Sequence, residues 1–123
     1  MAQGRKRRPE NPSVEMIGAF RTMWVIVMFD LPVDNPESRK NYQAFRKSLL
    51  ENSFTMLQFS VYARHAYSPE NAATHIERTR KVIPPDGHVR IFQITDKQFE
   101  RMKVYNGKTR GKTEKAPEQL TFF

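Results

Sequence analysis

The pattern of hydrophobic and polar positions predicts three strand regions that are separated by two helices. The apolar run at residues 23–29 is continuous and rich in β-branched and aromatic side chains, which is typical of a strand buried on both faces. We therefore expect it to lie in the centre of its sheet. Residues 54–64 are long enough for one bent strand or two short ones, and residues 88–94 alternate hydrophobic side chains between two faces and predict a further strand.

Proline and acidic residues mark the start of each predicted helix. Asp34 or Asn35 can cap the first helix, with Pro36 at its first position, and apolar residues at 42, 45 and 49 follow at helical spacing. The segment 68–70 repeats this start, and residues 72, 76, 79 and 83 give a second amphipathic helix that the prolines at 84 and 85 end. His75 on this helix is expected to face solvent, and His88 lies beside the following turn.

This order of elements predicts an α+β fold, the ferredoxin-like βαββαβ sandwich, with two helices on one face of an antiparallel sheet. We divide the chain into a basic flexible tail at 1–21, the ferredoxin-like domain at 22–105, and a C-terminal extension at 106–123. Residues 97–101 predict a short helix or turn, 102–105 a weak strand, and the following segment a mobile basic loop. The apolar end, with Leu120, Phe122 and Phe123, predicts an edge strand that pairs with a partner or a second copy.

Composition and charge narrow the possible functions. The chain of 123 residues carries 21 Lys and Arg against 13 Asp and Glu, a formal net charge of +8, which favours a polyanionic partner such as nucleic acid. No cysteine is present, which excludes disulfide scaffolds, thiolate zinc sites and a cysteine nucleophile. The longest apolar run covers only about a third of the roughly 20 residues that a membrane-spanning helix needs. The basic cluster at residues 5–8 lacks the apolar segment of a secretory signal.

Asp30 is the strongest candidate for chemistry. It directly follows the central hydrophobic strand, and Leu31 and Pro32 then turn the chain away. A carboxylate held rigidly at the edge of a buried strand suits a hard cation such as Mg²⁺. The alternative is a turn residue, since Asp is common before a proline-containing turn. One carboxylate is a poor metal site alone, and a two-fold dimer would bring a second Asp30 to the ion.

Other polar residues leave two interpretations open. His65 at the end of a strand is either a general base or phosphate contact, or a structural residue. The basic cluster at 5–8 is either an arm that follows phosphates or a solvated end. Cations elsewhere predict a sequence-independent contact with a nucleic-acid backbone. The candidates for this contact are Arg39, Arg46, Lys47, Arg64, Arg78 and Arg90.

Three stretches together resemble a known family. They are residues 24–32 with the acidic turn, residues 45–50 with 54–64, and residues 89–99. The family is the small CRISPR-associated endonuclease that partners the spacer integrase in adaptation, and the resemblance is closest to its type II branch. The resemblance covers roughly residues 22–105. The basic tail before residue 22 departs from the family pattern, in which the first strand begins near the N-terminus.

The resemblance implies a ferredoxin-like homodimer and a Mg²⁺-dependent nuclease, in which Asp30 is the metal-binding and catalytic residue. It also implies a cytoplasmic prokaryotic protein that binds the prespacer duplex DNA and bridges integrase dimers. This bridging role does not need nuclease chemistry in the family, and RNA is an alternative nuclease substrate. A stand-alone ferredoxin-like RNA-binding module or toxin-type endoribonuclease remains the alternative function, and it would prefer single strands.

Overall fold

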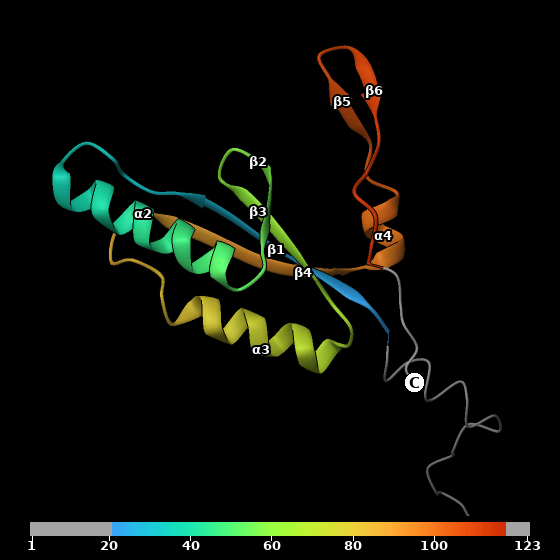
Figure 1. The fold of residues 1–123 in the computed structure, drawn as a ribbon, viewed down its shortest axis with the longest axis horizontal. Helices are drawn as coiled ribbons and strands as arrows, with labels where there is room; N and C mark the ends of the chain where they lie inside the picture. Colours follow the sequence, from blue (N-terminus) through green and yellow to red (C-terminus); the bar gives the residue numbers. More distant parts are fainter. Residues whose placement is uncertain (1–20, 118–123) are drawn as a thin grey trace, which may run out of the picture.

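A four-stranded antiparallel sheet with helices on its faces makes up the structure, a computed structural model that describes residues 21–117 (Figure 1). The elements in chain order are β1 (Met23–Asp30), α2 (Pro36–Glu51), β2 (Thr55–Gln58), β3 (Val61–Ala66), α3 (Pro69–Arg80), β4 (His88–Thr95), α4 (Asp96–Glu100), β5 (Val104–Asn106) and β6 (Thr109–Gly111). No helix within this part of the chain is long and apolar enough to cross a membrane.

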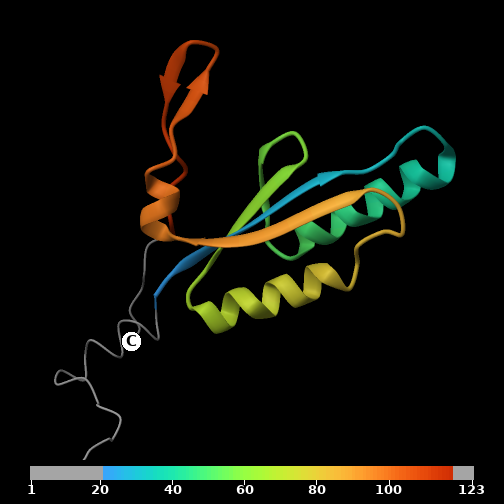
Figure 2. The same cartoon turned by 180° about the vertical axis from the view of Figure 1, so that it is seen from behind.

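Strand β1 lies inside the sheet, whose order is β2-β3-β1-β4. It pairs antiparallel with β3 on one side and with β4 on the other, and β2 pairs antiparallel with β3. Helices α2 and α3 lie on the same face of this sheet, as both views show (Figures 1 and 2). The ferredoxin-like βαββαβ sandwich and the central position of the first strand are therefore confirmed.

Both faces of β1 are buried, which explains its unbroken run of hydrophobic residues. Val25, Val27 and Phe29 face helices α2 and α3 and belong to the larger core. Trp24 and Ile26 face the other side of the sheet and belong to a smaller core. Helix α4 covers part of this second face, which we call the open face because neither α2 nor α3 lies on it.

The strand-like region 54–64 forms two strands rather than one bent strand. Strands β2 and β3 are joined by a tight turn in which Ser60 has a φ of 65°. The backbone N–H of Phe29 donates a hydrogen bond of 3.1 Å to the Ser60 carbonyl. This bond attaches the turn between β2 and β3 to the end of β1, next to Asp30.

Side-chain caps set the start of both long helices. Asn35 is the cap of α2, because its Oδ1 accepts a bond of 2.8 Å from the Ser38 N–H. Ser68 caps α3 in the same way. Helix α3 ends at Arg80, so the prediction that Ile83 belongs to it is wrong. The helical conformation is disfavoured for a residue that precedes a proline, and Ile83 precedes Pro84.

The C-terminal part of the described chain is more ordered than the sequence predicts. Helix α4 confirms the short helix after β4, and Thr95 and Gln98 form a capping box at its start. Residues 104–106 and 109–111 pair as the hairpin β5-β6: β5 overlaps the weak strand predicted at 102–105, and β6 lies where we predicted a mobile basic loop. Gly107 and Lys108 form the two-residue turn of this hairpin, and Gly107 has the positive φ, 66°, that favours glycine at the first position of such a turn. The hairpin extends away from helices α2 and α3 (Figure 2).

His75 lies inside the protein, so the prediction that it faces solvent is wrong. Only 6 % of its surface is exposed. Helix α3 buries Ala72, His75 and Thr79 together, because positions three and four apart share one face of a helix. The predicted face with Ala72, Ile76 and Thr79 does pack on the core, and His75 belongs to the same face.

Two of the predicted segments lie outside the described residues. These are the basic tail at 1–21, apart from Arg21, and the C-terminal residues Leu120, Phe122 and Phe123. Their predicted contacts with nucleic acid or a partner therefore stay predictions.

Candidate functional site

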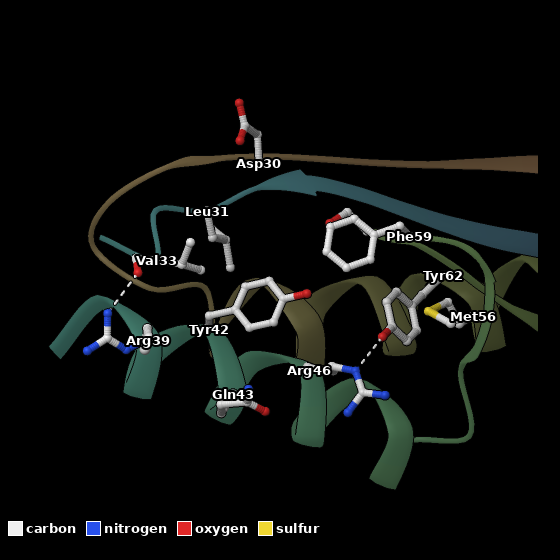
Figure 3. Close-up of a pocket in the computed structure, with 11 residues that line it drawn as sticks. Asp30, Leu31, Val33, Arg39, Tyr42, Gln43, Arg46, Met56, Phe59 and Tyr62 are labelled. Atoms are coloured by element: carbon white, nitrogen blue, oxygen red, sulfur yellow. Dashed lines mark hydrogen bonds between the residues drawn. The ribbon is translucent and has the colours of Figure 1, made fainter. Parts of the chain in front are cut away.

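Asp30 is the last residue of β1, and its side chain is exposed. Side chains alternate along a strand, so Phe29 points into the core beneath the helices and Asp30 points to the open face. Figure 3 shows the Asp30 carboxylate directed away from the aromatic side chains on the helical side of β1. The carboxylate is therefore carried by a backbone that the sheet holds in place, and it is open to solvent.

Gly87, in the turn before β4, lies very close to the backbone of Asp30. It has a φ of 99°, a conformation that favours glycine. A Cβ atom at this position would lie 2.7 Å from the Asp30 carbonyl oxygen and 2.6 Å from a methyl group of Leu31. Only glycine fits this contact without movement, so the turn before β4 packs closely against the end of β1.

The register of β4 brings two further polar residues to Asp30, and the sequence analysis did not assign either as its neighbour. His88 lies directly opposite Asp30, and Arg90 lies opposite Met28. Directly opposed residues of an antiparallel pair project from the same face, so Asp30, His88 and Arg90 share one end of the open face. Both His88 and Arg90 are exposed. Strand register joins residues far apart in the chain, and no local signal could have shown it.

The described residues do not build a complete metal site around Asp30. Within residues 21–117, no group of three or more His, Cys, Asp or Glu side chains is placed to hold a metal ion. Mg²⁺ usually takes one or two carboxylates and completes its shell with waters and phosphate oxygens. Asp30 fits the role of such a ligand, provided that water, substrate or a second chain supplies the others.

A cavity of about 540 Å³ lies beside Asp30 on the helical side of β1. It is bounded by the end of β1, helix α2 and the turn between β2 and β3 (Figure 3). Two arginines line it: Arg46 Nε donates to the Tyr62 hydroxyl at 2.8 Å, and Arg39 donates to the Val33 carbonyl at 3.2 Å. Phe59 and Tyr42 add aromatic rings to the same wall.

The six predicted nucleic-acid contacts do not gather in one patch. Arg39, Arg46 and Lys47 lie on α2, whereas Arg78 lies on α3 and Arg90 on β4. All of these are exposed except Arg46, which is half-buried. They surround the sandwich, and three of them, Arg39, Arg46 and Arg90, lie nearest to Asp30.

Arg64 differs from the other predicted cations because it is bonded within the protein. Its guanidinium donates to the carbonyls of Asn52 at 2.8 Å and His65 at 3.0 Å. Burial, together with the nearby Arg78, lowers its pKa from the ordinary value. Arg64 therefore ties β3 to the end of helix α2.

His65 lies on β3, opposite the start of β1, and is therefore at the other end of that strand from Asp30. Its partner across the sheet is Trp24, whose ring meets the imidazole edge-on at 5.3 Å. Its Nε2 lies 3.2 Å from Asp96 Oδ1, and the Thr22 hydroxyl donates to the other oxygen of Asp96. Of the two interpretations of His65, the structural one fits this position, because it cannot reach a reaction at Asp30.

Acidification is expected to destabilise the fold through His65 and His75. Burial lowers the pKa of His65, against the opposing effect of Asp96, and burial with Arg64 and Arg78 lowers the pKa of His75. The unfolded chain therefore binds more protons below about pH 6.5, and stability falls as the pH falls. Denaturant unfolding at about pH 7.5 and about pH 5.5 measures the effect. A free energy of unfolding that is equal or higher at the acidic pH would contradict this origin.

Comparison with known proteins identifies the family. The model of the family "CRISPR associated protein Cas2" matches residues 23–102. The chain is 56% identical over 101 residues to a CRISPR-associated endoribonuclease Cas2 of Parvibaculum lavamentivorans, an alignment that covers 82% of this chain and 100% of the relative. It is 42% identical over 107 residues to the protein of the same name from Flavobacterium psychrophilum, covering 87% and 93% of the two chains. The chain therefore belongs to the Cas2 family of CRISPR-associated proteins.

Proposed function

We propose that this protein is a homodimeric subunit of CRISPR adaptation that cleaves RNA with the help of Mg²⁺ bound at Asp30. The observation that carries this proposal is the exposed carboxylate at the rigid end of β1, which makes no ion pair with another described residue. Its two relatives reported above are named endoribonucleases, which supports RNA as the substrate. The working environment would be the prokaryotic cytoplasm.

Asp30 would hold the metal, and the other residues of the open face would position the substrate. A bound Mg²⁺ supplies charge stabilisation at the phosphate and lowers the pKa of a bound water. Arg90 brings a permanent positive charge to the same face, where it would neutralise a phosphate oxygen of the strand. His88 lies opposite Asp30, and it would contact the same phosphodiester or a water molecule bound to it.

The apolar surface of the open face is the reason for proposing a homodimer. Neither α2 nor α3 covers it, and an apolar groove of about 310 Å³ runs along it between the sheet and the segment after α4. Phe92 stays 41 % exposed there, although it lies beside the buried Ile26. Apolar surface of this kind is typical of an interface between protein chains. Asp30 projects from the same face, so a two-fold axis through it would bring two Asp30 carboxylates towards one ion.

The proposal is tested by metal removal. Cleavage of a labelled single-stranded RNA is expected to require Mg²⁺, to stop in EDTA, and to return when excess Mg²⁺ is added. The same incubation with Ca²⁺ serves as a control for charge screening, because Ca²⁺ takes more ligands and a looser geometry. Cleavage at an unchanged rate in EDTA would contradict the metal mechanism.

A second candidate function is a duplex-binding scaffold that bridges integrase dimers. Exposed cations support it: they cover α2 and α3, and the hairpin β5-β6 carries Lys108 and Arg110 away from the body of the protein (Figure 1). In this role the dimer would grip the backbone of a prespacer duplex while the integrase performs the chemistry.

The scaffold is tested by the salt dependence of duplex binding. Affinity for duplex DNA is expected to fall steeply with salt, since each neutralised phosphate releases counterions. Arg78→Ala is expected to reduce the slope of log affinity against log salt by about one. Thr74→Ala, an exposed neutral change on the same helix, is the matched control. A duplex affinity that does not respond to salt, or the absence of duplex binding, would exclude this role.

A further inference from the structure

We propose that the cavity beside the end of β1 binds one unpaired nucleobase, which stacks on Phe59 while an arginine of helix α2 holds its phosphate. This site deepens the proposed function and rests on it in one respect, namely that the bound strand is the one cleaved at Asp30. The ligand class is a single-stranded nucleic acid, recognised through an aromatic face and a phosphate.

Phe59 is the first observation behind this proposal. It lies in the turn between β2 and β3, where the φ of 65° at the next residue, Ser60, bends the backbone sharply. Its side chain is 79 % exposed, more than any other large hydrophobic side chain within residues 21–117, and it belongs to neither core. Packing within the chain therefore does not explain a phenyl ring at this position.

The setting of Phe59 is the second observation. Its ring lies at the wall of the cavity together with Tyr42 of α2 and Tyr62 of β3 (Figure 3). Aromatic side chains beside positive charge are the usual means by which proteins bind single strands, since every base has a face that stacks. The volume of about 540 Å³ lies within the range of small-ligand sites, roughly 300–1,000 Å³.

The polar groups of the cavity match a nucleotide rather than a neutral ligand. Arg46 uses only Nε to bond the Tyr62 hydroxyl, and this leaves its two terminal amino groups to donate to an anion. Arg39 lies about two turns earlier on α2 and offers a second cation. Gln43 lies between them in sequence and supplies an amide that can bond the edge of a base.

Duplex nucleic acid does not fit the same cavity. Bases in a duplex are stacked on their neighbours and paired, so none can enter a pocket without being flipped out. Bases of single strands can be splayed out and stacked on protein side chains. Asp30 belongs to the edge of the cavity, and its carboxylate points away from the aromatic rings and the two arginines (Figure 3).

The test is binding in EDTA, where cleavage does not contribute. Fluorescence anisotropy of a labelled oligouridylate is expected to show that Phe59→Ala weakens binding roughly tenfold or more, the size of one lost base stack. Phe59→Trp is expected to keep the affinity, and its new indole is expected to be quenched on binding. Tyr67→Ala, an exposed aromatic outside the cavity, is the matched control and is expected to bind as the wild type does.

Three further ligands show whether binding depends on base stacking or on the phosphate charge, and whether the bound strand is RNA or DNA. Oligothymidylate distinguishes DNA from RNA, an abasic strand of equal length keeps the phosphates only, and a duplex keeps its bases paired. The effect of Phe59→Ala is expected to vanish for the abasic strand and the duplex. Arg46→Ala is expected to weaken binding of the abasic strand as well.

Equal affinity of wild type and Phe59→Ala for the oligouridylate would overturn the base site. So would an equal loss of affinity for the abasic strand, because stacking would then play no part. Neither result bears on the metal site, whose test is cleavage by Asp30 variants. Conversely, if an Asp30 variant cleaves normally while Phe59→Ala loses single-strand binding, the base site stands and the proposed role of Asp30 in cleavage fails.

Discussion

Replacing Asp30 with asparagine is expected to lower the rate of RNA cleavage by about 100-fold or more. Asparagine keeps the shape of the side chain and removes its charge, so the anionic ligand for the metal is lost while β1 is unchanged. A metal ion supplies several kcal/mol of charge stabilisation to the transition state, and about 1.4 kcal/mol corresponds to a factor of ten in rate. Initial rates on a labelled RNA at saturating Mg²⁺ give the measurement.

The control for Asp30→Asn is Asp34→Asn. Asp34 is also exposed and lies in the turn that follows β1, but it is not the cap of helix α2, because Asn35 has that role. We expect Asp34→Asn to cleave at the wild-type rate. A cleavage rate in Asp30→Asn within about threefold of wild type would remove Asp30 from the mechanism, and circular dichroism and the thermal midpoint would show whether the fold is intact.

Replacing Phe45 with alanine is expected to lower the free energy of unfolding by about 3–5 kcal/mol. Phe45 is 1 % exposed and is one of the largest fully buried side chains of helix α2. Its ring meets that of Phe29 edge-on, with 5.1 Å between the ring centres. The change therefore leaves a cavity between helix and sheet and removes one partner of an aromatic pair.

The matched control for Phe45→Ala is Leu50→Ala on the same helix. Leu50 is 43 % exposed, so its truncation is expected to change the free energy of unfolding by no more than about 0.5 kcal/mol. Urea unfolding of the three proteins gives both values. Similar losses from the two substitutions would mean that helix α2 does not carry the core contact assigned to Phe45.

The position of Phe45 was predictable because its signal is local. Residues 42, 45 and 49 lie on one face of any helix that begins at Pro36, and the sheet needs such a face. The caps Asn35 and Ser68 were signalled in the same way, by a capping residue before a proline. The hairpin β5-β6 also had a local signal, Gly107 at its turn, which the density of basic residues around it obscured.

His75 and Arg64 show where local patterns fail. On α3 the apolar pattern located Ala72, Ile76 and Thr79 on the packed face, but only the packing of α3 on the sheet shows that the polar His75 is buried with them. Arg64 has the sequence environment of a surface cation, but the end of α2 offers it the Asn52 carbonyl. Which carbonyl lacks a partner depends on the whole fold, and therefore no short segment shows it.

The sequence by itself determined the order of elements, the central strand, and Asp30 as the candidate for chemistry, because hydrophobic periodicity and capping act over a few residues. Only the tertiary structure decided what surrounds Asp30. The register of β4 places His88 and Arg90 on its face, and the turn at Phe59 forms a cavity with α2 on the other side of β1. These contacts join residues that are far apart in the chain, and their positions follow from strand pairing and packing rather than from any local preference.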